Sequence, residues 1–111
     1  MKLAYGIFYT KDIDRISDFY QNTIGIQKAF GNERFVAFNI GDSLLGIKVV
    51  ETPREIPGHQ TVIIEAENVD ETYKVFKENG VIIDKEISDE EWGRNFSILD
   101  PDLNKVEFFQ K

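Results

Sequence analysis

Apart from its carboxylates, this 111-residue chain has few side chains that can carry acid-base or metal chemistry. It has one histidine, His59, and no cysteine, which excludes disulfides, thiolate metal sites and cysteine nucleophiles. Neither a phosphate-binding glycine loop nor a serine-nucleophile motif is present. Catalytic chemistry therefore depends on carboxylates, of which Glu107 is the one to consider first.

Glu107 lies in a predicted strand over residues 105–110, where side chains alternate between two faces. Val106 and Phe108 suit a face covered by a helix, which leaves Glu107 facing a cavity. A carboxylate in a concave, aromatic-lined site either pairs with a cation or has its protonation altered. The alternative interpretation is a solvated strand carboxylate near an open cavity mouth.

Aromatic residues are the second sign of a binding cavity. Nine phenylalanines, four tyrosines and one tryptophan exceed what so small a core requires. Alternation along a predicted strand over residues 3–9 puts Tyr5, Ile7 and Tyr9 on one face. Trp92 stands at a strand entrance, where its ring can stack on a ligand or a partner subunit, although a structural role fits equally well.

Net charge narrows the range of partners. Twenty acidic residues against 13 basic ones give a net charge of -7, which argues against nucleic-acid binding. No stretch is long and apolar enough to span a membrane, and because the first residues lead straight into a predicted strand we expect no signal peptide. We therefore expect a cytoplasmic protein whose partner is a cationic or aromatic small molecule, with no nucleic-acid or membrane partner.

An internal repeat predicts how these residues are positioned. When the first half is moved along the chain until Asp12 falls on Asn68, the first strand and helix of the two halves align. When it is moved slightly further, until Asp42 falls on Asp102, the later strands align. Each half therefore reads as a strand, a helix and then further strands.

The two halves supply matching elements around a linker that contains Pro53 and Pro57. Helices are predicted over 12–22 and 68–79, capped by Asp12 and Asn68, with Glu71 completing a capping box. Strands are predicted over 3–9, 35–40, 44–50, 61–65, 81–87, 94–99 and 105–110. We expect one domain over 1–111, built from modules over 1–52 and 58–111.

This doubled arrangement resembles the vicinal oxygen chelate superfamily, which includes glyoxalase I, extradiol dioxygenases, and bleomycin- and fosfomycin-resistance proteins. The resemblance covers the whole chain. Its most specific motifs are Asp18-Phe-Tyr with Ile24-Gly, Asn79-Gly-Val, Trp92-Gly-Arg, and Asp100-Pro-Asp-Leu-Asn-Lys-Val-Glu. It implies an α+β fold of two βαβββ repeats, whose curved mixed sheets form a cup-shaped cavity with the helices outside. Many members complete their cups as homodimers, so a homodimer is expected.

Metal-using members of this superfamily bind their metal at four equivalent positions, which by the family's spacing and by the repeat fall on Tyr5, Ile47, Thr61 and Glu107. Only Glu107 is an ordinary metal ligand, whereas Lewis-acid chemistry needs about three nitrogen or oxygen donors. The resemblance therefore implies a binding protein without metal, cofactor or catalytic residues, similar to the bleomycin-resistance branch. Its expected ligand-binding residues are Tyr5, Ile7, Tyr9, Ile47, Thr61, Trp92 and Glu107.

A glyoxalase-type lyase, isomerase or dioxygenase is the alternative. In that interpretation Glu107 acts as a base or metal ligand, and a β-bulge brings His59 into the site. Spacing favours a linker histidine instead, because His59 precedes its helix cap, Asn68, by two positions more than Tyr5 precedes Asp12.

Overall fold

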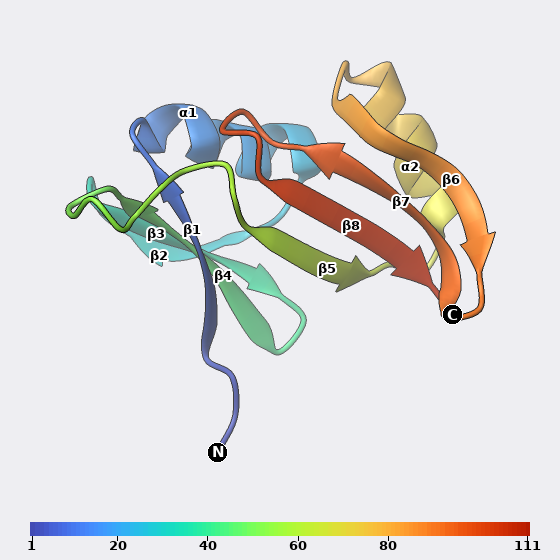
Figure 1. The fold of residues 1–111 in the computed structure, drawn as a ribbon, viewed down its shortest axis with the longest axis horizontal. Helices are drawn as coiled ribbons and strands as arrows, with labels where there is room; N and C mark the ends of the chain where they lie inside the picture. Colours follow the sequence, from blue (N-terminus) through green and yellow to red (C-terminus); the bar gives the residue numbers. More distant parts are fainter.

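The computed structural model describes residues 1–111 and contains two four-stranded sheets with two helices. Figure 1 shows the helices along one side of the molecule and the first residues projecting from the other side. The first module comprises β1 (Tyr5–Thr10), α1 (Ile13–Asp18), a π-helical turn η1 (Phe19–Ile24), β2 (Lys28–Gly31), β3 (Phe35–Ile40) and β4 (Ser43–Val49). The second comprises β5 (Thr61–Glu65), α2 (Val69–Glu78), β6 (Ile82–Glu90), β7 (Gly93–Leu99) and β8 (Lys105–Gln110). The predicted α+β fold of two βαβββ repeats is confirmed.

The two sheets have the same topology. Sheet 1 has the order β1-β4-β3-β2, and sheet 2 has the order β5-β8-β7-β6. In each sheet the first strand pairs in parallel with the last, and the other pairs are antiparallel. β1 and β5 are consequently edge strands, and they approach each other where a Cβ added to Gly6 would lie 3.8 Å from Val62 Cγ2.

Both helices begin at the predicted capping residues. The Asp12 side chain accepts a hydrogen bond from the backbone N–H of Arg15 (3.2 Å), and the Asn68 side chain accepts one from that of Glu71 (3.1 Å). The predicted capping box is only half formed, because the Glu71 carboxylate makes no hydrogen bond back to Asn68. Neither helix has the length and apolar character needed to span a bilayer.

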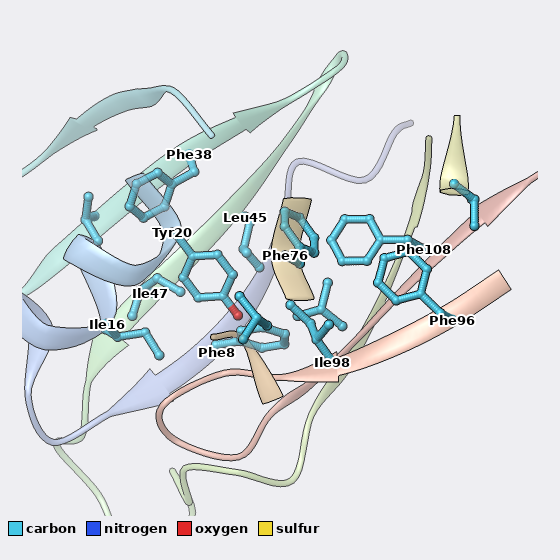
Figure 2. Packing of buried hydrophobic residues seen from close by; sticks show 14 residues of the cluster. Phe8, Ile16, Tyr20, Phe38, Leu45, Ile47, Phe76, Phe96, Ile98 and Phe108 are labelled. Atoms are coloured by element: carbon cyan, nitrogen blue, oxygen red, sulfur yellow. The ribbon is translucent and has the colours of Figure 1, made fainter. Parts of the chain in front are cut away.

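The first helix ends in a π-helical turn that a regular helical spacing does not predict. This turn, η1, holds Tyr20 with no exposed surface. Such turns are rare, and their hydrogen bonds span one residue more than those of an α-helix. Figure 2 shows the Tyr20 ring beside Phe38 and Phe8, with ring centroids 6.0 and 6.3 Å away.

A single cluster of 14 buried apolar residues fills the space between the helices and the sheets. Both modules contribute to it, and Figure 2 shows Phe76, Phe96 and Phe108 gathered in the second module. Phe96 stacks on Phe108 with ring centroids 5.3 Å apart. Since burial of apolar surface is the main favourable term in folding, this shared cluster is what holds the modules together.

A buried hydrogen-bond network also joins the modules, and we call it the Tyr20–Asp100 latch. The Tyr20 hydroxyl donates to Asp100 Oδ2 at 2.6 Å, and Asp100 is only 1% exposed. Asp100 accepts three further bonds, from the backbone N–H groups of Asp102 and Asn104 (both 2.9 Å) and from Asn104 Nδ2 (3.0 Å). Asn104 Oδ1 in turn accepts from the backbone N–H of Gly58 in the linker (3.1 Å). Burial raises the pKa of the Asp100 carboxyl, and burial next to that carboxylate raises the pKa of the Tyr20 hydroxyl.

Candidate functional site

The face of sheet 1 that turns away from α1 carries an open row of aromatic residues. Tyr5, Ile7 and Tyr9 share this face, and Tyr5 is 40% exposed. The edge of the Tyr5 ring meets Phe35 at a centroid distance of 5.9 Å, and Phe30 stacks on Phe35 at 6.3 Å. Sheet 1 therefore offers an aromatic wall to anything placed against it.

Ile47 was predicted to face the same cavity, and that prediction was wrong. Ile47 has no exposed surface and belongs to the hydrophobic core beneath α1. The cause is the length of one turn. Leu44 pairs with Asn39 on β3, whereas its counterpart Lys105 pairs with Leu99 on β7, so the turn before β8 is one residue longer.

When the last strands of the two modules are compared, Leu44 of β4 is therefore equivalent to Lys105 of β8. The alignment of the sequence repeat had made Leu45 equivalent to Lys105. A register change of one residue moves a side chain to the opposite face of a sheet. In the observed register, Gly46 and not Ile47 is the structural counterpart of Glu107. A Cβ at Gly46 would lie 2.7 Å from both Ile7 Cδ1 and Phe35 Cζ, so hydrocarbon already fills this position.

Glu107 lies on the matching face of sheet 2. The residue as a whole is only 8% exposed, and its carboxylate makes no hydrogen bond or ion pair with the rest of the chain. Its neighbours across the sheet are Ile63 on β5 and Ser97 on β7. The Glu107 oxygens are not among the fully buried atoms that lack a partner, so they can be reached by a donor from another molecule.

Two further polar side chains on this face were missed from the sequence. Asn95 and Ser97 are fully buried. Lys85 Nζ donates to Asn95 Oδ1 (2.6 Å), and the Ser97 hydroxyl donates to Asp84 Oδ2 (2.9 Å). The alternation of polar and apolar residues along β7 is the sequence pattern from which Asn95 and Ser97 could have been predicted. Together with Glu107 they form a polar floor on sheet 2.

Trp92 and Thr61 lie at the margins of the same face. Trp92 is 47% exposed, and its ring lies 5.7 Å from that of Phe109, which shares the Glu107 face of β8. Thr61 is exposed at the start of β5. The structure thus groups Trp92, Thr61 and Glu107 on sheet 2. The aromatic row lies on sheet 1, and none of the four main cavities of the single chain is lined by residues from both groups.

The residues at the four metal positions do not fit a transition metal. By strand register these positions are Tyr5, Gly46, Thr61 and Glu107, which offer one carboxylate and no imidazole. His59 is exposed in the linker, before β5 begins, and no group of three or more histidine, cysteine, aspartate or glutamate side chains is placed to hold a metal. This donor set falls short of the three nitrogen or oxygen ligands that a catalytic metal requires.

Solved structures from several bacteria share this fold. A bleomycin-binding protein from Streptomyces verticillus, in complex with copper(II)-bleomycin, has a TM-score of 0.82 and 22% identity, covering 100% of this chain and 97% of that one. TnmS3, an antibiotic binding protein from Streptomyces sp. CB03234, has a TM-score of 0.87 and 21% identity, covering 99% and 95%. A lactoylglutathione lyase from Agrobacterium tumefaciens has a TM-score of 0.82 and 19% identity, covering 98% and 92%. At these identities the likeness establishes the fold alone.

No curated protein matches the chain significantly. The family model described as Glyoxalase/Bleomycin resistance protein/Dioxygenase superfamily matches residues 2–108. This match confirms the resemblance seen in the sequence motifs, and it agrees with the paired βαβββ modules. The chain therefore belongs to the Glyoxalase/Bleomycin resistance protein/Dioxygenase superfamily.

Proposed function

We propose that this protein binds a cationic or aromatic small molecule, without a metal, in a cleft that two copies of the chain complete. The observation that carries the proposal is Glu107, a residue only 8% exposed whose carboxylate has no partner within the chain. The solved relatives named as bleomycin-binding and antibiotic binding proteins support a binding role for this fold. The proposed ligand-binding residues are Tyr5, Ile7, Tyr9, Thr61, Trp92 and Glu107.

A positive charge on the ligand follows from the electrostatics of the site. A carboxylate without a partner in its own chain is stabilised most by a charge-assisted hydrogen bond from a cation. The net charge of -7 favours the approach of such a ligand. Aromatic faces such as those of Tyr5 and Trp92 also attract cations and flat rings.

A second copy of the chain is proposed because the two faces are open in the single chain. The large side chains Tyr5, Phe30, Ile63 and Trp92 are 40%, 49%, 57% and 47% exposed, so each sheet leaves apolar surface uncovered in the single chain. A two-fold dimer can set sheet 1 of one copy against sheet 2 of the other. The aromatic wall would then face Glu107. Light scattering tests this arrangement, and a mass near 12.8 kDa at micromolar concentration contradicts it.

Benzamidine and benzamide make a matched pair of probes, because both are flat and only benzamidine is charged at neutral pH. Trp92 is the only tryptophan, so its fluorescence can report binding. Glu107→Gln is expected to weaken the binding of benzamidine by about 1–3 kcal/mol and to leave the binding of benzamide unchanged. Glu78→Gln is the control, because it also removes one negative charge but lies at the end of α2, outside the site.

Bleomycin is a further ligand to test, because a relative of the same fold binds it. Two results would contradict the proposal. One is equal benzamidine affinity for the wild type and Glu107→Gln, with circular dichroism showing both folded. The other is stoichiometric zinc, nickel or iron in protein purified without chelator, which would favour the lyase or dioxygenase alternative.

A further inference from the structure

The helix side of the molecule has its own cavity, which we call the intermodule groove. It has a volume of about 480 Å³ and lies between α2 of the second module and the segment after α1 of the first. Its apolar lining includes Ile24, Ile26, Ile40, Ile64, Val75 and Phe76. Ile40 and Ile64 pack against the hydrophobic core, which places the groove on the helix side of the sheets and away from Glu107.

Charge on the groove is entirely negative. Glu67 and Glu71 are its only ionisable lining residues, and neither carboxylate makes a hydrogen bond or ion pair within the chain. An adjoining cavity of about 670 Å³ shares Ile40 and Ile64 with the groove, and its only ionisable residue is Glu65. With no lysine or arginine lining either cavity, the charge is complementary to a cation.

The start of α2 does not offer an anion site that would compete with this preference. The Val69 N–H donates to Gln110 Oε1 (2.8 Å), and the Glu71 N–H donates to the Asn68 side chain (3.1 Å). The chain therefore uses its own side chains to satisfy these amides, which are the groups that would otherwise bind an anion.

The shape of the ligand follows from the kind of apolar side chain. Isoleucine and valine dominate the groove, and leucine, valine and isoleucine continue along the adjoining cavity. Such a lining has few flat surfaces on which a ring can stack, and it suits a flexible hydrocarbon chain. Cavities at the junction of two structural units are common ligand sites.

We propose that the intermodule groove binds a single-chain amphiphilic cation, such as an alkylammonium. Its hydrocarbon chain lies along the isoleucines, and its ammonium group lies between Glu67 and Glu71. The groove shares no lining residue with the Glu107 cleft, whereas the adjoining cavity includes Thr61, so occupancy of the groove is tested at residues of the groove alone.

The test compares octyltrimethylammonium, octyl glucoside and octyl sulfate by calorimetry, each below its micelle concentration. The three probes share one chain and differ in the charge of the head group. The cation is expected to bind tightest and the anion weakest. Amide shifts in heteronuclear NMR spectra should appear at Ala66, Asn68 and Thr72, which line the groove, and not at Ser97.

Two variants separate the contributions of charge and shape. The double variant Glu67→Gln, Glu71→Gln should lower the affinity for the cation about tenfold, because two exposed carboxylates are lost. Val75→Trp fills the groove from an exposed helix position and should abolish binding of all three probes. Glu78→Gln, at the end of α2, should leave cation binding unchanged. The amides of Ala66, Asn68 and Thr72 report the groove alone, so a failure of the Glu107 cleft does not affect this result.

Three outcomes would overturn the proposal. Equal affinity for the three head groups would make the groove a nonselective apolar surface. Amide shifts confined to the Glu107 face would assign the cation to the cleft instead. A change in molecular mass on Val75→Trp, with probe affinity unaltered, would show that a second copy of the chain covers the groove.

Discussion

The Tyr20–Asp100 latch makes a quantitative prediction about stability. Tyr20→Phe removes one hydroxyl from a fully buried ring and leaves the ring's contacts with Phe8 and Phe38 in place. Asp100 would keep three of its four donors but lose the shortest bond, of 2.6 Å. Hydrogen bonds to charged groups contribute about 1.5–3 kcal/mol, so we expect a loss of about 2 kcal/mol and a fall in Tm of about 8 °C.

The cost of Tyr20→Phe should also depend on pH. In the folded chain, burial raises the pKa of the Asp100 carboxyl above its ordinary value of 3.8. At a pH between the ordinary and the raised pKa, Asp100 therefore binds a proton in the folded chain and not in the unfolded chain. As the pH falls through this range, the contribution of Asp100 to the free energy of unfolding therefore increases. Because the protonated carboxyl no longer accepts a charge-assisted bond, the cost of Tyr20→Phe should shrink over the same range.

Urea unfolding of the wild type, Tyr20→Phe, Asp100→Asn and the double variant measures the coupling directly. Tyr73→Phe is the matched control, because Tyr73 bonds the Glu86 carboxylate at the surface, and its loss should be clearly smaller. A cost below about 0.5 kcal/mol for Tyr20→Phe, or equal costs in the wild-type and Asp100→Asn backgrounds, would refute the reasoning.

Three further changes test other parts of the structure. Gly46→Ala should cost about 1–3 kcal/mol in urea unfolding, because its Cβ would lie 2.7 Å from the Phe35 ring and must displace it. Arg94→Ala should lower stability most at low salt, since Arg94 bonds Asp70 of α2 and a β6 aspartate at the surface; equal losses at low and high salt would contradict this. Asn68→Ala should cost about 1 kcal/mol and reduce helical circular dichroism, because it removes the cap of α2.

Most of the fold could be predicted because its signals are local. Capping residues Asp12 and Asn68 mark both helix starts, and strands 35–40, 61–65 and 105–110 have the predicted bounds. No strand was predicted where the short strand β2 lies, and the irregular β6 was predicted with different bounds. β6 shifts register twice against β7 and runs on to Glu90, beyond its predicted end.

The site was predicted less well because it depends on register between distant strands. Alternation along β8 correctly placed Glu107 away from Phe108, but the alignment of Asp42 with Asp102 put Ile47 in the wrong position. That alignment holds for β3 and β7 and fails for the strands that follow, since the intervening turns differ by one residue. Nothing in the local sequence reveals such a difference, because both turns contain the residues that turns prefer.

The latch also has a consequence for the order of folding. Tyr20 and Asp100 are 80 residues apart in sequence, whereas the hairpins and helix starts within each module close over a few residues. Closing the longer loop costs more chain entropy, so the modules should acquire their own structure before the latch forms. Tyr20→Phe should then speed unfolding and leave the refolding rate nearly unchanged in stopped-flow experiments. We therefore expect the latch to govern how long the two modules stay docked once the chain has folded.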